Sequence, residues 1–260
     1  MLLGADPEMM AVDRYGNPQP ICGLLGGTKE SPIPVPMGAY QEDNVNPEFN
    51  IDPAHTEEQW VEHLTSVIKH VDTRLEPLQL KLAAVPSFHY TPETLESLGS
   101  AAMSFGCNPD RNVWTGDWNR SPNPYTTLRS AGGHIHFSCR EDEVDSIVKL
   151  MDIYLGIPSV LLDPDKSRRE AYGKAGSFRY KPYGGEYRTL SNFWVGEERL
   201  MRWAYRMSQK AYKDLAHLPE LVARITPYTI QQCINTADVE SAKDIVTDLD
   251  LDIPSYMRNI

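Results

Sequence analysis

The stretch Arg129-Ser-Ala-Gly-Gly-His-Ile-His136 leads into and overlaps a segment, residues 130–138, that has the alternation of a β-strand. Because successive side chains of a strand point to opposite faces, His134 and His136 share one face and Ile135 lies on the other. Two imidazoles at this spacing are a common arrangement for first-row metals such as zinc, iron or manganese. The alternative is a pair of hydrogen-bonded histidines in the core. The two glycines before them allow backbone or ligand to approach closely.

Acidic residues alternate in the same way on two segments nearer the N-terminus. Asp6 and Glu8 leave one face of a predicted strand over residues 1–12, and Glu48 lies within a second predicted strand over residues 40–51. Two carboxylates on one face repel each other unless a cation lies between them, so the pair is a candidate metal site. The alternative is a pair of exposed acids on an edge strand.

A third polar set surrounds the segment 177–192, whose two consecutive glycines predict a β-hairpin. Glu186 and Arg188 share a face of its second arm, and Arg179 lies on the first arm, five residues after Lys174. Planar guanidinium groups bind phosphate through paired hydrogen bonds, whereas lysine acts as a point charge. A carboxylate beside them binds a metal that bridges the same phosphates. The alternative is a ladder of salt bridges on the hairpin surface.

Together these sets place acids, histidines and bases on strands that are able to form one concave sheet face. That inventory suits a nucleotide triphosphate held by divalent cations. The sequence contains neither a Walker A motif nor GxGxxG, so neither a P-loop nor a Rossmann fold accounts for such a site.

Hydrophobic residues between the polar strands recur at the spacing of amphipathic helices. Thr56-Glu-Glu-Gln59 has the form of a capping box and predicts the start of a helix. Its apolar face then runs in three- and four-residue steps from Trp60 to Leu75. Similar patterns predict helices at residues 92–98, at 144–155, where Pro158 ends or kinks the helix, and at 197–218.

Segments rich in glycine, proline and asparagine separate these elements. Residues 18–40 are interpreted as a loop that reaches over a ligand site, and the irregular segment 106–127 as a second functional loop. A strand is expected at residues 80–88, and one or two short helices and an acidic tail at 248–252 end the chain. No internal repeat or flexible linker interrupts the sequence, which favours one α+β domain over residues 1–260.

Composition limits the classes of protein to which the chain belongs. It has 260 residues, of which 41% are hydrophobic and 23% charged, which excludes a disordered or fibrous protein. Its formal net charge of −11 opposes bulk binding of nucleic acid. No apolar run is long enough to span a membrane and no signal peptide is apparent, so we expect a cytoplasmic protein. Four widely spaced cysteines, without a CxxC pair, are expected to be free and mostly buried.

The order of these motifs resembles a known superfamily, the carboxylate-amine ligases related to glutamine synthetase and glutamate-cysteine ligase. The motifs are Asp6-Pro-Glu8, Pro47-Glu-Phe-Asn-Ile51, Gly132-Gly-His-Ile-His136 and Glu186-Tyr-Arg188. The segments 129–136 and 172–194 resemble more closely the phage-encoded branch called COOH-NH2 ligase type 2. The resemblance covers roughly residues 1–215 and leaves 216–260 as a C-terminal helical extension.

This resemblance implies a glutamine synthetase-like catalytic domain, in which helices pack on the outer face of a curved antiparallel sheet. It further implies ATP and two or three Mg²⁺ or Mn²⁺ ions. By position in the motifs, the metal ligands are Asp6, Glu8, Glu48, His134 and Glu186, with either Glu42 or Asp43 as a further acid. The residues that bind the nucleotide are Lys174, Arg179, His136 and Arg129, and those that act on the transferred phosphoryl group are Arg188, Arg179 and His136.

The implied activity is ATP-dependent formation of an amide between a small-molecule acid and a small-molecule amine, through an acyl phosphate. The ammonium site of glutamine synthetase is not identifiable, so a larger amine fits equally well. The chain also lacks room for the separate N-terminal domain of glutamine synthetase, and a homo-oligomer is left open. Three alternatives remain: a kinase of the same fold, a metallohydrolase that does not use ATP, and a non-catalytic binding module. A phage-encoded enzyme of this kind would act in the host cytoplasm.

Overall fold

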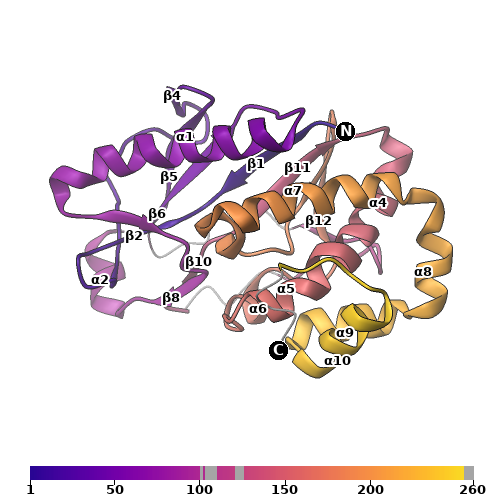
Figure 1. Ribbon diagram of the computed structural model, residues 1–260. Helices are drawn as coiled ribbons and strands as arrows, with labels where there is room; N and C mark the ends of the chain where they lie inside the picture. The colour runs from indigo at the N-terminus through magenta and orange to yellow at the C-terminus, as the bar shows by residue number, and fades with distance from the viewer. Residues whose placement is uncertain (100–101, 103–109, 121–125, 255–260) are drawn as a thin grey trace.

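The computed structural model describes residues 1–99, 102, 110–120 and 126–254 (Figure 1). Its largest sheet is antiparallel and has five strands in the order β1, β11, β13, β12 and β9, which comprise Leu3–Pro7, Gly133–Ser138, Gly184–Tyr187, Ser177–Lys181 and Arg111–Asn112. The smaller sheets contain β3 (Pro18–Gln19), β2 (Met10–Val12) and β7 (Lys81–Ala83); β4 (Ile33–Val35), β5 (Gly38–Asp43) and β6 (Asn46–Ile51); and β10 (Leu128–Ser130) with β8 (Ser87–His89).

One face of the large sheet is apolar and faces the helices. Leu3, Ile135, Phe137 and Tyr187 alternate with the polar residues of the same strands and are at most 1% exposed. Helix α4 packs on β13, and α7 packs on α4. The helices are α1 (Glu57–Leu75), α2 (Pro92–Ser97), α4 (Val144–Met151), α5 (Ile157–Leu162), α6 (Arg168–Ala171), α7 (Glu198–Lys213), α8 (Leu218–Arg224), α9 (Pro227–Thr236) and α10 (Val239–Asp248).

Helix α1 confirms the prediction from periodicity. Thr56 is its N-cap and accepts a hydrogen bond from the Gln59 backbone N–H at 3.2 Å. The reciprocal bond differs from a capping box, because the Gln59 side chain accepts from the N–H of His55 rather than from that of Thr56. The apolar face packs against α7, and Trp60 stacks on Trp194, in the 3₁₀ turn Asn192–Gly196 before α7, with 5.5 Å between ring centroids. Its buried residues are Trp60, Val61, Leu64, Val67, Val71 and Leu75.

The single strand predicted over residues 40–51 is wrong. The chain forms a hairpin of β5 and β6, and it turns at Asn44, whose φ of 55° lies in the left-handed region that asparagine tolerates. Isolated bridges Leu3↔Ala54 and Glu8↔Glu48 join this hairpin to the free edge of β1. The hairpin therefore extends the polar face of the large sheet and brings the acidic residues of both its strands to β1.

Three other predicted strands are divided by the tertiary structure. After β1 the chain bends at Glu8, whose N–H donates to the carbonyl of Gly132 at 2.8 Å, and the following residues pair in a different sheet. Local alternation does not reveal such a change of partner. Residues 1–12 thus form β1 and β2, residues 80–88 contain β7 and the start of β8, and residues 130–138 contain the end of β10 and all of β11.

The predicted helix at 144–155 continues past its expected end through an irregular turn. Helix α4 leads into a π-helical turn, Asp152–Gly156, and then into α5, which has Pro158 in its first turn. Proline has no N–H and its ring crowds the carbonyl four residues earlier, so a wider turn relieves the clash. Pro158 therefore bends the helical path and does not end it.

The C-terminal segment is more helical than predicted. Three helices, α8, α9 and α10, replace the one or two expected, and the acidic tail is anchored because Leu251 and Ile253 are buried. Their side chains belong to the same hydrophobic cluster as Leu3 in β1. No helix among the described residues is long and apolar enough to cross a membrane. Of the cysteines, Cys22, Cys139 and Cys233 are free thiols, and Cys107 lies outside the described residues.

The mixture of helices and antiparallel strands confirms the α+β class. The helix predicted at 92–98 is α2, and Thr91 is its N-cap. The helix predicted at 197–218 is α7 followed by a short 3₁₀ turn, and the hairpin predicted at 177–192 is β12 with β13. These elements depend on local signals, and they form where those signals lie.

Candidate functional site

The register of the large sheet brings the polar strand residues together in two rows. Asp6 of β1 lies opposite His134 of β11, and in the next row His136 lies opposite Glu186 of β13, which in turn lies opposite Arg179 of β12. All of these side chains leave the face that the helices do not cover. The predicted strand faces are therefore confirmed, and residues from four strands meet on one surface.

A first cluster of possible metal ligands comprises Asp6, His136 and Glu186, whose ligand atoms all lie within 4.8 Å of one another. The Nε2 atom of His136 is 2.9 Å from Asp6 Oδ1. His134 lies at the edge of this cluster, with its Nδ1 atom 3.3 Å from Asp6 Oδ1 and 3.8 Å from Glu186 Oε1. Both histidines of the strand thus face the same carboxylates.

Gly132 is required for the position of His134. A Cβ atom at Gly132 would lie 2.3 Å from His134 Nε2, far inside van der Waals contact. The predicted close approach therefore occurs, and it is made by an imidazole ring. Burial and the charge of Arg188 together lower the pKa of His134 to about 4, so the ring is neutral at pH 7. A neutral imidazole is the form that binds a metal.

A second cluster comprises Glu8, Asp43 and Glu48 and lies where β1 meets the β5–β6 hairpin. Gln41 donates to Glu48 Oε2 at 2.6 Å, and the N–H of Gly132 donates to Glu8 Oε2 at 3.1 Å. These two donors fix the orientation of the carboxylates. The cluster contains both predicted acids from this region, Glu8 and Glu48.

The structure distinguishes between the two candidates for a further acid. Asp43 belongs to the second cluster. The carboxylate of Glu42 instead accepts hydrogen bonds from three backbone N–H groups, those of Gly23, Leu25 and Gly26, at 2.7, 2.6 and 2.7 Å. Glu42 therefore holds the loop that precedes β4, and Asp43 is the acid that is placed to bind a metal.

The electrostatics of the second cluster suit a cation. Burial, Asp6 and Glu8 raise the pKa of Glu48 to about 9, and burial together with Asp43 raises the pKa of Glu8 to about 8. Carboxyl groups crowded in this way resist ionisation until a positive charge lies among them. Oxygen donors are the ligands that Mg²⁺ and Mn²⁺ prefer, so the residues fit a divalent cation.

Glu186 is the most strongly paired acid of the site. It forms ion pairs with Arg188, with Lys181 at 2.7 Å and with Arg179 at 3.9 Å. Burial and Asp6 raise its pKa, but Arg188 and the two histidines outweigh them, and the pKa falls to about 2. Glu186 therefore stays ionised. It contacts basic side chains and also belongs to the first cluster, with Asp6 and His136.

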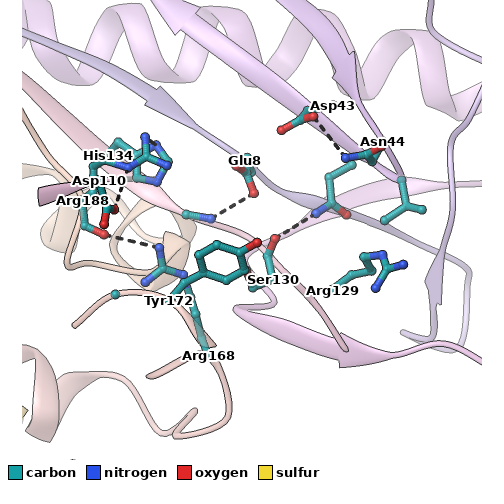
Figure 2. Close-up of a pocket in the computed structure, with 14 residues that line it drawn as sticks. Glu8, Asp43, Asn44, Asp110, Arg129, Ser130, His134, Arg168, Tyr172 and Arg188 are labelled. Atoms are coloured by element: carbon teal, nitrogen blue, oxygen red, sulfur yellow. Dashed lines mark hydrogen bonds and ion pairs between the residues drawn. The ribbon is translucent and has the colours of Figure 1, made fainter. Parts of the chain in front are cut away.

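Arg188 links the two ends of the site. Its guanidinium donates to Asp110 at 3.2 Å, to Glu186 and to His134 Nδ1 at 3.2 Å. Figure 2 shows Arg188, Asp110 and His134 side by side at one end of a cavity, with Glu8 facing the same space. This cavity of about 70 Å³ has room for several water molecules or for one small polar group.

Arg129 and Lys174, the two other predicted nucleotide-binding residues, lie near the small polar cavity. The buried guanidinium of Arg129 lines the same cavity but donates to the backbone carbonyls of Ala102, Thr126 and Leu128. The backbone carbonyl of Lys174 accepts from Thr189 Oγ1 at 3.0 Å, and Lys174 follows Gly173, which lines the cavity. Nucleotide binding by either side chain remains a prediction.

Sequence reasoning missed Arg168, Asp110 and Lys181. Arg168 is 3% exposed and lines the cavity, and its Nε atom has no hydrogen-bond partner in the described part of the chain. A Cβ atom at Gly173 would lie 2.1 Å from its guanidinium, so this glycine makes room for it. Lys181 is two residues after Arg179, and strand alternation gave a signal for it. Arg168 begins the short helix α6 and Asp110 lies in an irregular segment, and neither position gave a sequence signal.

The two loops predicted to be functional both reach the site. Lys29, within residues 18–40, lines a cavity with Arg179 and Lys181, and so does Trp118, within residues 106–127. A further cavity, of about 350 Å³ and lined by mainly apolar atoms, lies beside His136 above Gly4. The polar face is therefore flanked by two larger cavities. Part of the segment 106–127 lies outside the described residues.

Comparisons with known proteins place the chain in a family. No curated protein matches it. Among solved structures, one described as apo GmaS without ligand aligns with 99% of this chain and 71% of its own chain, at 11% sequence identity and a TM-score of 0.41. The pattern of the phage phiEco32-like COOH.NH2 ligase-type 2 family matches residues 110–256, which is more than half of the chain and includes His134, His136 and the β12–β13 hairpin. The chain belongs to this family of COOH-NH2 ligases.

Proposed function

We propose that the protein is an ATP-dependent ligase that joins a carboxylic acid to an amine and releases ADP and phosphate. The observation that carries this proposal is the pairing of two cation-binding clusters on one sheet face, with Arg179 and Arg188 beside them. Two cation-binding clusters on one face suit a triphosphate, because metal ions neutralise its several negative charges. Membership of a COOH-NH2 ligase family supports ligation as the overall reaction.

The chemistry explains why phosphates must be bound next to an acid. A carboxylate is a poor electrophile, so an oxygen of the acid first attacks the γ-phosphorus of ATP, and ADP leaves. The resulting acyl phosphate is attacked at its carbonyl carbon by the amine nitrogen. The carbon–oxygen bond to phosphate then breaks, inorganic phosphate leaves, and the nitrogen loses a proton to give the amide.

Two divalent cations, Mg²⁺ or Mn²⁺, would be held by the two clusters, and a third ion is not required by the arrangement. Asp6, His136 and Glu186, with His134 at the edge, would bind one, and Glu8, Asp43 and Glu48 the other. When bound, these ions supply positive charge that neutralises the triphosphate. Hydrogen bonds from Gln41 to Glu48 and from the Gly132 N–H to Glu8 fix the orientation of these two carboxylates.

The basic residues of the sheet face are placed to stabilise the phosphoryl group during transfer. Arg179 and Arg188 flank Glu186, and fixed guanidinium groups bind phosphate oxygens without reorganisation. Arg188 is held by Asp110, so its position does not depend on the ligand. His136, whose Nδ1 lies 2.5 Å from the hydroxyl of Tyr183, faces the phosphates from the opposite side.

The apolar cavity beside His136 is the proposed binding site of the nucleotide base. Gly4, Ile51 and Tyr183 are among the residues that line it. An aromatic base requires apolar walls, and phosphates attached to it would pass over His136 toward Glu186 and Arg179. The smaller polar cavity near Arg168 and Arg188 then remains for the acid or the amine.

The test is a search for the ligated product. The protein is incubated with ATP, Mg²⁺ and a bacterial metabolite extract, and mass spectrometry looks for masses equal to acid plus amine minus water. We expect such a product together with equimolar ADP and phosphate. A product that retains the phosphoryl group, or a metal-dependent product formed without ATP, would contradict the proposal.

A matched pair of variants tests the assignment of the site. Arg179→Gln is expected to lower ADP formation by about 100-fold or more, since it removes a charge from the phosphoryl group in transfer. Arg206→Gln changes the same charge at an exposed position of α7 and is expected to leave the rate unchanged. Equal rates in the two variants would refute a role for Arg179.

A further inference from the structure

A second basic surface lies at the outer edge of the large sheet, beyond the cation-binding clusters. It is a cavity of about 630 Å³ lined by seven residues, of which four carry cationic side chains and three are aromatic. No carboxylate is among the described residues that line it, although the whole chain carries a net charge of −11. The lining residues are Lys29, Arg111, Trp118, Phe178, Arg179, Tyr180 and Lys181.

Three separate segments of the chain deliver these cations. Arg179 and Lys181 lie on β12, Arg111 on β9, and Lys29 at the tip of a turn closed by two hydrogen bonds between Thr28 and Ser31. The loop that carries this turn is fixed to β5 by Glu42. Glu186 pairs with two of these cations, Lys181 and Arg179, but a single carboxylate does not balance four positive charges, so the arrangement favours a further anion.

The aromatic residues give the cavity a second property. The guanidinium of Arg111 lies over the ring of Trp118, 4.8 Å from its centroid, which fixes both side chains. Trp118 is 62% exposed, whereas Trp60, Trp194 and Trp203 are fully buried. Trp118 is therefore a natural reporter of any ligand that enters this cavity.

The cavity adjoins the proposed phosphoryl-transfer site. The Nζ atom of Lys181 is 2.7 Å from Glu186 Oε2, and Arg179 NH1 is 3.9 Å from Glu186 Oε1. Glu186 belongs to the first cation-binding cluster. A ligand held by these basic residues would thus reach from the outer edge of the sheet to the bound cation.

We propose that this cavity is a binding site for a multiply charged anion that carries phosphate or carboxylate groups, and that Lys29 closes it. Two sources have this chemistry: the terminal part of a triphosphate, and an acid substrate with more than one negative charge. Anion binding does not depend on the function proposed above. Only the choice between a triphosphate and an acid substrate as the bound anion rests on the proposed ligase function.

Inorganic tripolyphosphate is the probe for the test, with binding measured by calorimetry and by tryptophan emission. Lys29→Met is expected to weaken binding about tenfold, the loss typical of one hydrogen bond to a charged group. Lys69→Met removes the same charge from α1, where Lys69 lines a different cavity, and is expected to bind as the wild type does. Trp118→Phe is expected to abolish the emission change. Failure of tripolyphosphate to bind, or equal affinity in Lys29→Met and the wild type, would overturn the proposal.

Competition with MgATP separates the two sources. If saturating MgATP displaces tripolyphosphate, the cavity receives the phosphates of the nucleotide. If both bind together, it receives an anionic acid substrate. Either result supports an anion site that requires Lys29. Binding of tripolyphosphate by a protein that does not bind MgATP would refute the proposed function and leave the anion site intact.

Discussion

Glu48 has a pKa of about 9 because its carboxyl is buried and faces Asp6, Glu8 and Asp43. The unfolded chain releases this proton near pH 4.5, so between these values the folded state binds more protons than the unfolded state does. Stability therefore falls as pH rises through this window, when no cation is present. Added Mg²⁺ should reverse the loss, since it binds the ionised cluster.

Replacement of this carboxyl by its neutral isostere tests the argument. Glu48→Gln is expected to raise the Tm of the cation-free protein at pH 8 by about 5 °C and to change it little at pH 4. The variant should also gain less from Mg²⁺. Differential scanning fluorimetry with and without EDTA measures both effects, with the exposed Glu220→Gln as the control. A lower Tm for Glu48→Gln at pH 8 without cations would refute crowding of the acids.

Gly4 provides a second test at the level of one residue. A Cβ at this position would meet only His136 Cβ at 3.7 Å and the carbonyl of Ile51 at 3.9 Å, both ordinary contacts. Gly4→Ala should therefore bind MgATP nearly as the wild type does, whereas Gly4→Leu should fill the apolar cavity and weaken binding at least tenfold. Tripolyphosphate, which has no base, should bind both variants equally. Wild-type MgATP affinity in Gly4→Leu would place the base elsewhere.

Among the helices and strands, the sequence predicted most accurately those whose signals lie within the segment itself. Helix α1 and the β12–β13 hairpin form as expected because a cap, an apolar stripe and a glycine turn lie within each segment. The β5–β6 hairpin was predicted as one strand, since its two-residue turn at Asn44 leaves the polar and apolar alternation almost unbroken. That error hid the reason why Asp43 joins Glu8 while Glu42 points to the loop.

The same limit applies to the site. Strand alternation grouped Asp6, His134, His136 and Glu186 within their own strands, the resemblance to the ligases suggested one site, and the register of the sheet brings them together with Arg179. Arg168 and Asp110 reach the cavity only through the packing of α6 and of the segment after residue 109, and no short-range pattern reports such packing. Long-range contacts, rather than residue type, decide which polar side chains complete the site.

The loop before β4 depends on one carboxylate. Glu42 accepts from three backbone N–H groups, so Glu42→Ala should leave them without a protein acceptor and free the loop that carries Lys29. We expect amide exchange at Gly23, Leu25 and Gly26 to accelerate at least tenfold, and tripolyphosphate to bind more weakly. Glu30→Ala, an exposed change in the same loop, is the control. Unchanged exchange in Glu42→Ala would contradict this role.

At the scale of the whole molecule, acidic and basic side chains occupy different parts of the large sheet's polar face and edge. Asp6, Glu186, Glu8, Asp43 and Glu48 form the two cation-binding clusters, and four cations line the cavity at the edge of the same sheet. Carboxyl groups are therefore gathered where we expect metal ions, and none is among the described residues that line the anion cavity. A net charge of −11 thus opposes bulk binding to nucleic acid without opposing a nucleotide at this face.

The C-terminal helices are coupled to the site by more than their apolar packing. Asn235 Oδ1 of α9 accepts from the N–H of Ala175 at 2.8 Å, next to Lys174, and Gln231 Oε1 accepts from Asn112 of β9 at 3.2 Å. The family match also runs past residue 215, to residue 256. We therefore expect residues 216–260 to belong to the catalytic domain rather than to a separable extension.

Two changes test this coupling. Deletion of residues 226–260 exposes the buried side of α5, so the shortened protein should lack the single cooperative thermal transition expected of the full chain. Asn235→Ala removes one hydrogen bond and should cost about 1–2 kcal/mol of unfolding free energy, and it should weaken tripolyphosphate binding because β12 loses support at its start. Thr236→Ala, at an exposed position of the same helix, should do neither. A shortened protein that unfolds cooperatively at the wild-type Tm and still binds tripolyphosphate would show that the C-terminal helices are a separate extension.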